Sequence, residues 1–226
     1  MKNNFNNHTV AVYAASFPFD ITDDYVCDER MREINGCADV NVKQAKYYVW
    51  KLLEIALRRT FGIALSETET YRDVNGKWHA DGFEFSLSHS GDVVAVAVSD
   101  APIGVDVELF NPDRFGENLQ KRIMTESEYA NIRALSAEER RRQANVLWCK
   151  KEALFKLDGG AKFIPNATET ETRRCIVKTV SDNGKTYVLA AASDNIQDIE
   201  FYGINVDISD MDATLIRYLE TILVQK

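Results

Sequence analysis

The sequence predicts an α+β protein of two similar lobes related by a pseudo-twofold axis, each a small antiparallel sheet packed with a long helix. Three observations predict this class: short runs of alternating apolar and polar residues, tight turns between the runs, and one long stretch of helical periodicity in each half of the chain. A chain of 226 residues can bury a substantial core. We therefore expect residues 1–105 to form an N-terminal lobe and residues 106–226 a C-terminal lobe of one compact unit.

In the first half, residues 10–15 are apolar and predict a short buried strand. From about residue 41 to residue 61 apolar side chains recur at helical spacing, and Gly62 follows as a C-cap glycine should. Residues 83–88 alternate strictly, as in a half-buried strand, whereas residues 93–98 are apolar on both faces and predict a strand inside a sheet.

The segment 103–109 reads IGVDVEL, and we expect it to complete a three-stranded meander with the two preceding strands. Residues two apart in a strand share a face, so Asp106 and Glu108 lie side by side. Gly104 on the same face would allow a ligand or a helix to approach closely.

The second half begins with two capping boxes, at Thr125 and at Ser136, and the second opens a long helix that ends at Gly159. Beyond it, Asn183-Gly184 is a strong hairpin signal. We expect hairpin strands at 175–180 and 186–192, a further strand at 201–208, and a closing helix from about 210 to 224.

Within the long helix, Trp148, Glu152 and Lys156 are four residues apart and form one stripe. If this helix packs on the strand of Asp106 and Glu108, three carboxylates and one lysine share a site. Such an anionic site favours a cation, and oxygen ligands favour Mg²⁺, which keeps positions for water and substrate phosphates. The pattern therefore points to phosphate chemistry, with Lys156 as an electrostatic clamp.

Each motif alone has a structural interpretation. Acidic residues alternating along a strand most often mark a solvated face, and Glu152 with Lys156 is an ordinary helix pair contributing about 0.2–0.5 kcal/mol. A lone His89 is usually a hydrogen-bonded structural histidine, and the capping box explains Glu128.

The combination and order of the motifs resemble the 4'-phosphopantetheinyl transferase superfamily, specifically its larger, two-lobed, surfactin-synthetase-activating type. The resemblance rests on residues 85–91 (FSLSHSG), residues 103–108 (IGVDVE) and residues 148–156 (WCKKEALFK). It implies transfer of 4'-phosphopantetheine from coenzyme A to a serine of an apo acyl or peptidyl carrier protein, with release of adenosine 3',5'-bisphosphate. It also implies dependence on Mg²⁺ and a place in fatty acid, polyketide or nonribosomal peptide biosynthesis.

The resemblance assigns roles residue by residue. The N-terminal lobe would contact the nucleotide, and the C-terminal lobe would carry the metal and the catalytic helix. Glu152 or Glu128 would accept the serine proton, a choice that the sequence leaves open. Asp106, Glu108 and Glu152 would bind Mg²⁺, and Lys156 and Lys77 would bind phosphates. Ser88 and His89 would contact the nucleotide end, with His89 at the 3'-phosphate, and Trp78 would pack near the adenine. Lys43 and Lys46 would make weaker phosphate contacts.

Composition limits the partners. A net charge of −8 argues against non-specific nucleic-acid binding, and no apolar run approaches the roughly 20 residues of a membrane span. Four cysteines without a CxxC spacing and the lack of a signal pattern favour the cytoplasm. We expect a monomer whose carrier protein is acidic and faces basic residues such as Arg114, Lys121 and Arg122.

Two alternatives use the same residues: a non-catalytic module that binds coenzyme A or a carrier protein, and a metal-dependent phosphohydrolase. The first predicts damaged acids, yet all three acids are present. A serine hydrolase based on residues 88–90 is disfavoured, because neighbouring strand residues point to opposite faces and the chain lacks a G-x-S-x-G elbow.

Overall fold

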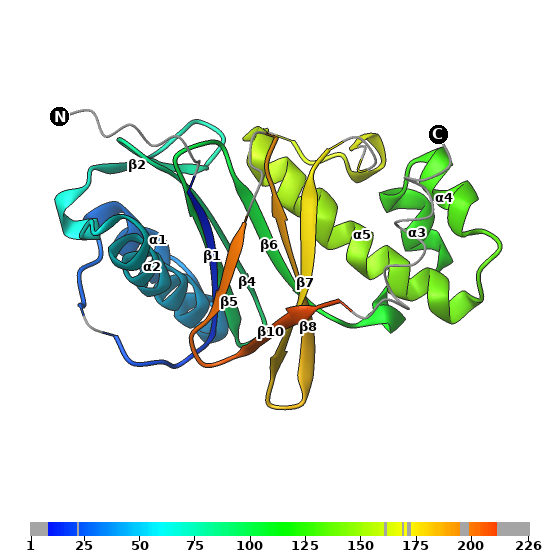
Figure 1. Cartoon of the computed structure of the whole chain (residues 1–226), viewed down its shortest axis with the longest axis horizontal. Helices are drawn as coiled ribbons and strands as arrows, with labels where there is room; N and C mark the ends of the chain where they lie inside the picture. Colours follow the sequence, from blue (N-terminus) through cyan, green and yellow to red (C-terminus); the bar gives the residue numbers. More distant parts are fainter. Residues whose placement is uncertain are drawn as a thin grey trace.

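The protein is a layered α+β structure in which two four-stranded sheets pack face to face between two long helices (Figure 1). The computed structural model describes residues 9–21, 23–160, 162–168, 170, 173–194 and 199–211. The α+β class is as the sequence predicts.

The first sheet has the order β4-β5-β1-β9, and its long helix α2 (Val40–Phe61) covers the outer face. Asp39 caps the start of α2 by accepting bonds from two backbone amides, and Gly62 ends it in the left-handed conformation at φ 70°. Strand β1 pairs antiparallel with β5 and parallel with β9. The strands are β1 (Val10–Ser16), β4 (Glu84–Ser90), β5 (Val93–Ser99) and β9 (Glu200–Gly203).

The second sheet has the order β10-β7-β8-β6 and is covered by α5 (Ala137–Asp158). A complete capping box at Ser136 begins α5, and Gly159 ends it at φ 62°. All neighbouring strands in this sheet are antiparallel. They are β6 (Gly104–Leu109), β7 (Cys175–Asp182), β8 (Lys185–Ala192) and β10 (Asp207–Asp210).

Strand β5 is apolar on both faces because both faces are buried. Val94, Val96 and Val98 pack under α2, whereas Val93 and Ala95 pack between the two sheets. Strand β6 behaves differently: Val105 and Val107 join the core between the sheets, and Asp106 and Glu108 are on its other face.

The expected three-stranded meander is wrong in its last member. Strand β5 is already paired on both edges, with β4 and with β1, so β6 has no free edge there. Instead β6 pairs with β8 of the second sheet. The lobe boundary expected at residue 105 therefore falls inside β6.

The strand expected at 201–208 is two strands in different sheets. Strand β9 pairs with β1 and β10 pairs with β7, and the chain bends between them at 204–206. Gly203 permits this bend, because a Cβ there would lie 2.1 Å from the carbonyl oxygen of Val206. The closing helix expected at 210–224 lies almost entirely outside the described residues.

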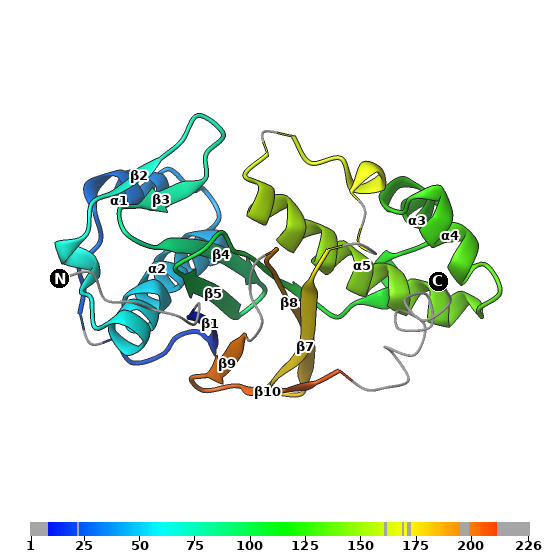
Figure 2. The same cartoon turned by 45° about the horizontal axis from the view of Figure 1, so that its top comes forward.

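Shorter elements complete the described chain. Strands β2 (Thr70–Arg72) and β3 (Trp78–Ala80) form a hairpin that lies beside the C-terminal end of α5 (Figure 2). None of the helices in the described ranges is long and apolar enough to cross a bilayer. The remaining elements are α1 (Asp28–Asn35), α3 (Glu117–Ile123), α4 (Glu126–Ile132), and the 3₁₀ turns η1 (Leu65–Glu67), η2 (Pro112–Arg114) and η3 (Pro165–Ala167).

Gly104 sets how closely α5 packs on β6. A Cβ at this position would lie 1.9 Å from the carbonyl oxygen of Ala153 and 2.5 Å from the amide nitrogen of Leu157. We expect Gly104→Ala to lower the free energy of unfolding by at least about 3 kcal/mol, the upper end for an overpacked core, because both obstructing atoms are backbone. Urea unfolding measures the change.

Gly36→Ala is the matched control. A Cβ there is in ordinary contact, 3.4 Å from the nearest atom, and the backbone φ is −73°. A loss for Gly104→Ala no larger than that for Gly36→Ala would show that the helix can withdraw from the strand at little cost.

Candidate active site

The candidate site is a cavity of about 310 Å³ at the junction of β4, β6 and α5. The face of β6 that lies away from the core between the sheets presents two acids, and α5 presents the Trp148, Glu152 and Lys156 stripe toward them. The structure thus brings together the three acids and the lysine that the sequence predicts on one site. The residues that line the cavity are Leu87, Ser88, His89, Asp106, Val107, Glu108, Arg114, Trp148, Glu152 and Lys156.

Asp106 is the most buried acid of the cavity, with 7% of its side chain exposed. Its Oδ1 accepts two hydrogen bonds, from Lys156 Nζ at 2.8 Å and from Ser88 Oγ at 2.7 Å. A carboxyl group bonded by both an ammonium and a hydroxyl is held in one orientation. Asp106 is therefore a fixed group within the cavity.

Glu108 lies nearer the cavity mouth and pairs with Arg114, whose Nη1 donates to Oε1 at 2.6 Å. Burial and the negative charge of Asp106 raise the pKa of Glu108, although Arg114 opposes the shift. From the sequence we expect Arg114 to face a carrier protein. In the structure its side chain is 55% exposed and its guanidinium pairs with an acid of this cavity.

Glu152 is the most perturbed acid of the three. Burial, followed by repulsion from Asp106, raises its pKa from 4.5 to about 7, and the nearby Lys156 only partly opposes this. A carboxyl group with a pKa near neutrality can exchange a proton at physiological pH. Such shifts are concentrated at functional sites.

The raised pKa of Glu152 makes stability depend on pH. Between pH 4.5 and about 7 the folded protein binds this proton and the unfolded chain releases it. We therefore expect the free energy of unfolding, measured without divalent cations, to receive a contribution from Glu152 that falls as pH rises through this window. Urea titrations across the window check this, and Glu152→Gln should remove that part of the slope; an unchanged slope in the variant would contradict the assignment.

The oxygen donors of Asp106, Glu108 and Glu152 fit Mg²⁺, which takes a few carboxylates and fills its other positions with water and phosphate oxygens. Their mutual repulsion, visible in the raised pKa values of Glu108 and Glu152, is a second sign that a cation suits the cavity. Within the described ranges, no three His, Cys, Asp or Glu side chains are arranged so that they could hold a metal ion as they stand. Lys156 and Arg114 supply positive charge between the acids.

A group of cations lies beside His89 at the rim of the cavity. Desolvation by the surrounding protein and the charges of Lys156, Arg30 and Lys46 lower the pKa of His89. Glu33 holds two of these cations, accepting from Arg30 at 2.6 Å and Lys46 at 2.9 Å. Partial burial opposes its ionisation, but these two partners lower the pKa of Glu33 to about 2.

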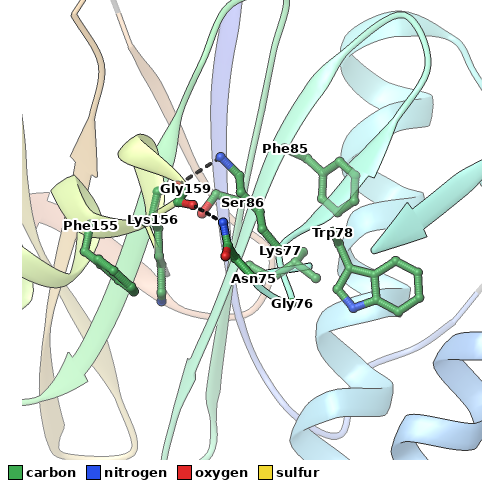
Figure 3. Close-up of a pocket in the computed structure, with 11 residues that line it drawn as sticks. Asn75, Gly76, Lys77, Trp78, Phe85, Ser86, Phe155, Lys156 and Gly159 are labelled. Carbon is green, nitrogen blue, oxygen red and sulfur yellow. Dashed lines mark hydrogen bonds between the residues drawn. The ribbon is translucent and has the colours of Figure 1, made fainter. Parts of the chain in front are cut away.

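A second cavity of about 390 Å³ adjoins the first and shares Leu87 and Lys156 with it. Two bonds cross it from the β2–β3 hairpin to the end of α5: Lys77 Nζ donates to the Lys156 carbonyl at 2.9 Å, and Asn75 Nδ2 donates to the Gly159 carbonyl at 3.1 Å (Figure 3). Trp78 forms part of the wall, but its ring is largely buried and packs edge-on against Trp50. It is a core residue with one edge on the cavity.

Glu128, the other candidate proton acceptor, does not line either cavity. Its residue is 4% exposed, and its carboxylate accepts bonds from Lys151 Nζ at 2.6 Å, Thr170 Oγ1 at 2.9 Å and the amide of Thr125 at 2.8 Å. None of these three partners lines either cavity. The geometry therefore separates Glu128 from the acids that surround Glu152.

Two parts of the site escaped the sequence analysis. Arg30 and Glu33 come from residues 20–38, whose mixed acidic pattern gave no clear element. The spacing of the two in helix α1 would have suggested an ion pair, but only the fold brings it beside His89. Lys43, which the sequence proposed with Lys46, is half-buried on the first turn of α2.

Comparisons with known proteins match the part of the chain that includes β6 and α5. Residues 102–196 match the sequence model of the 4'-phosphopantetheinyl transferase superfamily. The 4'-phosphopantetheinyl transferase psf-1 of Bacillus pumilus is 40% identical over 77 residues, which are 34% of this chain and 32% of that protein. The 4'-phosphopantetheinyl transferase AcpT of Salmonella typhimurium is 33% identical over 80 residues, which are 35% of this chain and 42% of that protein. The 4'-phosphopantetheinyl transferase Sfp of Bacillus subtilis is 32% identical over 81 residues, which are 36% of this chain and 35% of that protein. The matched part of the chain thus spans about a third to two fifths of these relatives' length.

Proposed function

Because residues 102–196 match the 4'-phosphopantetheinyl transferase superfamily and contain the acids and lysine of the cavity, we propose that this chain is such a transferase. The reaction moves 4'-phosphopantetheine from coenzyme A to a serine of an apo acyl or peptidyl carrier protein. The serine oxygen bonds to the phosphorus next to pantetheine, the pyrophosphate bond breaks, and adenosine 3',5'-bisphosphate leaves. The observation that carries this proposal is the convergence of Asp106, Glu108, Glu152 and Lys156 on one cavity.

We propose that Asp106, Glu108 and Glu152 hold Mg²⁺, which when bound would neutralise charge on the pyrophosphate. Lys156 supports this role from the chain itself, because its ammonium lies 2.8 Å from Asp106 and its side chain is one quarter exposed. It can therefore bind a phosphate oxygen while keeping Asp106 oriented.

For the proton of the carrier serine we propose Glu152 as the acceptor. It lines the cavity, and burial and the charge of Asp106 raise its pKa to about 7 in the metal-free protein. Glu128 is less suitable because its carboxylate is occupied by Lys151 and is buried away from both cavities.

The nucleotide end of coenzyme A is assigned to the cation group and the second cavity. We propose that His89 and Lys46 bind the 3'-phosphate, with Arg30 adding charge from beneath. Lys77 would reach the phosphates from the second cavity, where its ammonium lies against the end of α5. Lys43 keeps a weaker, peripheral role.

Two related lobes are also part of the proposal. Each half has a strand, then a 22-residue helix, then a hairpin whose second strand pairs with the initial strand of that half. The first half has the order β1, α2, β4, β5, and the second half has the order β6, α5, β7, β8. This repeated order supports a pseudo-twofold relation with the boundary before β6. A cytoplasmic monomer with an acidic carrier partner completes the proposal, and exposed Arg122 of α3 remains a candidate contact for that carrier.

The decisive experiment incubates the protein with coenzyme A, Mg²⁺ and an apo carrier protein, and follows the carrier by mass spectrometry. We expect the mass of phosphopantetheine to be added to the carrier serine. A carrier whose serine is replaced by alanine is the control and should stay unmodified. Absence of transfer to several acyl and peptidyl carriers would refute the proposal.

The same reaction without carrier protein separates the alternatives. A phosphohydrolase would release phosphopantetheine to water, and a non-catalytic module would bind coenzyme A unchanged. We expect little cleavage until the carrier is added, because the serine is the intended nucleophile.

A further inference from the structure

The edge where the two sheets meet is joined by serine side chains. Strand β4 of the first sheet lies beside β6 of the second, but the two form no backbone ladder with each other. Instead, Ser86 Oγ accepts from the Val105 amide at 3.0 Å, Ser88 Oγ from Val107 at 3.2 Å, and Ser90 Oγ from Leu109 at 2.9 Å. Three hydroxyls spaced two apart thus replace the carbonyl groups of a neighbouring strand.

Each serine also faces the residue that precedes its amide partner. Ser88 donates its proton to Asp106 Oδ1 at 2.7 Å, and the Ser90 side chain opposes the rise in the pKa of Glu108. For Ser86 the equivalent position is Gly104, which has no side chain. The segment SLSHS at 86–90 and the segment GVDVE at 104–108 are therefore matched in register, with one acid for each of the last two serines.

From this register we infer that Ser88 is a positioning residue, which orients Asp106 by bonding its carboxylate and the next backbone amide of β6 at once. We infer that Ser90, which bonds the Leu109 amide at the matching position, acts in the same way on Glu108. The inference rests on the proposed function in that it takes these acids as the cation ligands. It assigns the Ser88 hydroxyl to the protein rather than to the nucleotide, which differs from the expectation drawn from the resemblance.

The bonds explain why a hydroxyl is required at this place. A hydroxyl has one proton to donate and lone pairs to accept, so one atom serves both the carboxylate and the amide. Both Ser88 and Lys156 bond Oδ1 of Asp106 and so fix the orientation of its carboxylate. Partners of this kind orient metal ligands, and their loss typically weakens metal binding about 10- to 100-fold.

The test compares serine variants of the full-length protein by titration with Mn²⁺ alone, with free Mn²⁺ measured by electron paramagnetic resonance. We expect Ser88→Ala to raise the dissociation constant by about 10- to 100-fold. Ser86→Ala is the matched control, since it loses the same kind of amide bond but no acid. It should leave the Mn²⁺ affinity within about threefold of wild type, a change worth less than about 0.7 kcal/mol.

Two further variants keep the outcome decisive. Ser88→Thr retains the hydroxyl and should restore most of the affinity. Ser90→Ala should weaken Mn²⁺ binding through Glu108, and because Ser90 is only half-buried this variant replaces Ser88→Ala if the latter does not fold. Equal affinities of the Ser86 and Ser88 variants, unchanged affinity in Ser90→Ala, or no Mn²⁺ binding by wild type would each overturn the inference.

The outcome is distinct from that of the transfer assay. A wild-type protein that binds Mn²⁺ in the serine-dependent way but transfers no phosphopantetheine would refute the proposed function and leave the inference standing. A protein that performs the transfer, but whose Ser88→Ala and Ser90→Ala variants bind Mn²⁺ with normal affinity, would refute the inference and leave the proposed function standing.

Discussion

Asp106→Asn and Glu152→Gln are each expected to reduce phosphopantetheine transfer by about 10²–10³-fold, equivalent to about 2.7–4 kcal/mol of transition-state stabilisation. Each change removes one negative charge while keeping the shape of the side chain. In Asp106→Asn the amide oxygen can still accept from Ser88 and Lys156, so the fold should persist. The measurement is the rate of carrier modification at saturating coenzyme A and Mg²⁺.

A second readout of Asp106→Asn separates an electrostatic effect from a structural one. Repulsion by Asp106 contributes to the raised pKa of Glu152. Removing that charge should lower the pKa of Glu152 in the metal-free protein, which a carboxyl-labelled NMR titration can follow.

Glu84→Gln is the control for both substitutions. Glu84 is half-exposed on β4 and lines neither cavity, so its loss of charge should leave the rate within about twofold of wild type. Rates near wild type in Asp106→Asn and Glu152→Gln would place the reacting centre elsewhere.

Local patterns in the sequence predict most of the elements of this fold. The capping box at Ser136 and the terminal glycines Gly62 and Gly159 mark ends of the two long helices, and periodicity identifies the strands. These signals act over a few residues, where backbone geometry and capping bonds determine the outcome. The α+β class follows from them.

Strand pairing is the part that local patterns do not contain. Nothing within residues 93–109 tells that β5 is paired on its second edge by β1, some eighty residues earlier in the chain. The switch of β6 to the second sheet is therefore a tertiary effect. The division of 200–210 into two strands has the same origin, because each half pairs with a different sheet.

In the candidate site too, local patterns predict some features, and others depend on packing between distant elements. Alternation along a strand and four-residue spacing along a helix place Asp106, Glu108, Glu152 and Lys156 on two faces, and the structure brings those faces to one cavity. The partners of these residues depend on packing between elements. Arg114 on Glu108, Ser88 on Asp106 and Lys151 on Glu128 join residues that no short-range pattern relates.

Lys151→Met is expected to lower the free energy of unfolding by about 3–5 kcal/mol, the cost of breaking a buried ion pair from one side. The Lys151 side chain is fully buried, and its ammonium donates to Glu128 and to the Pro165 carbonyl, at 2.6 and 2.8 Å. Burial lowers the pKa of Lys151 and the charge of Glu128 opposes this, so the ammonium depends on its partner. Urea unfolding measures the loss.

Lys150→Met serves as the control, because Lys150 is adjacent on α5 but only half-buried. Its substitution should change the free energy of unfolding by no more than about 0.5 kcal/mol. A similar loss in both variants would show that the effect comes from the helix surface and not from the buried pair.

The double variant Lys151→Met/Glu128→Gln tests the reason for the loss. The introduced glutamine would keep the capping box with Thr125 and a bond with Thr170, and it would leave no unpaired charge in the interior. We therefore expect the double variant to be more stable than Lys151→Met alone.

Because Lys151 and Glu152 are neighbours on α5, they point to different sides of the helix. Lys151 ties α5 to α4 and η3, whereas Glu152 faces the cavity. We expect the folded double variant to keep substantial transfer activity, whereas Glu152→Gln loses it. This result would show that Lys151 holds the helix in place and that Glu152 takes part in the chemistry.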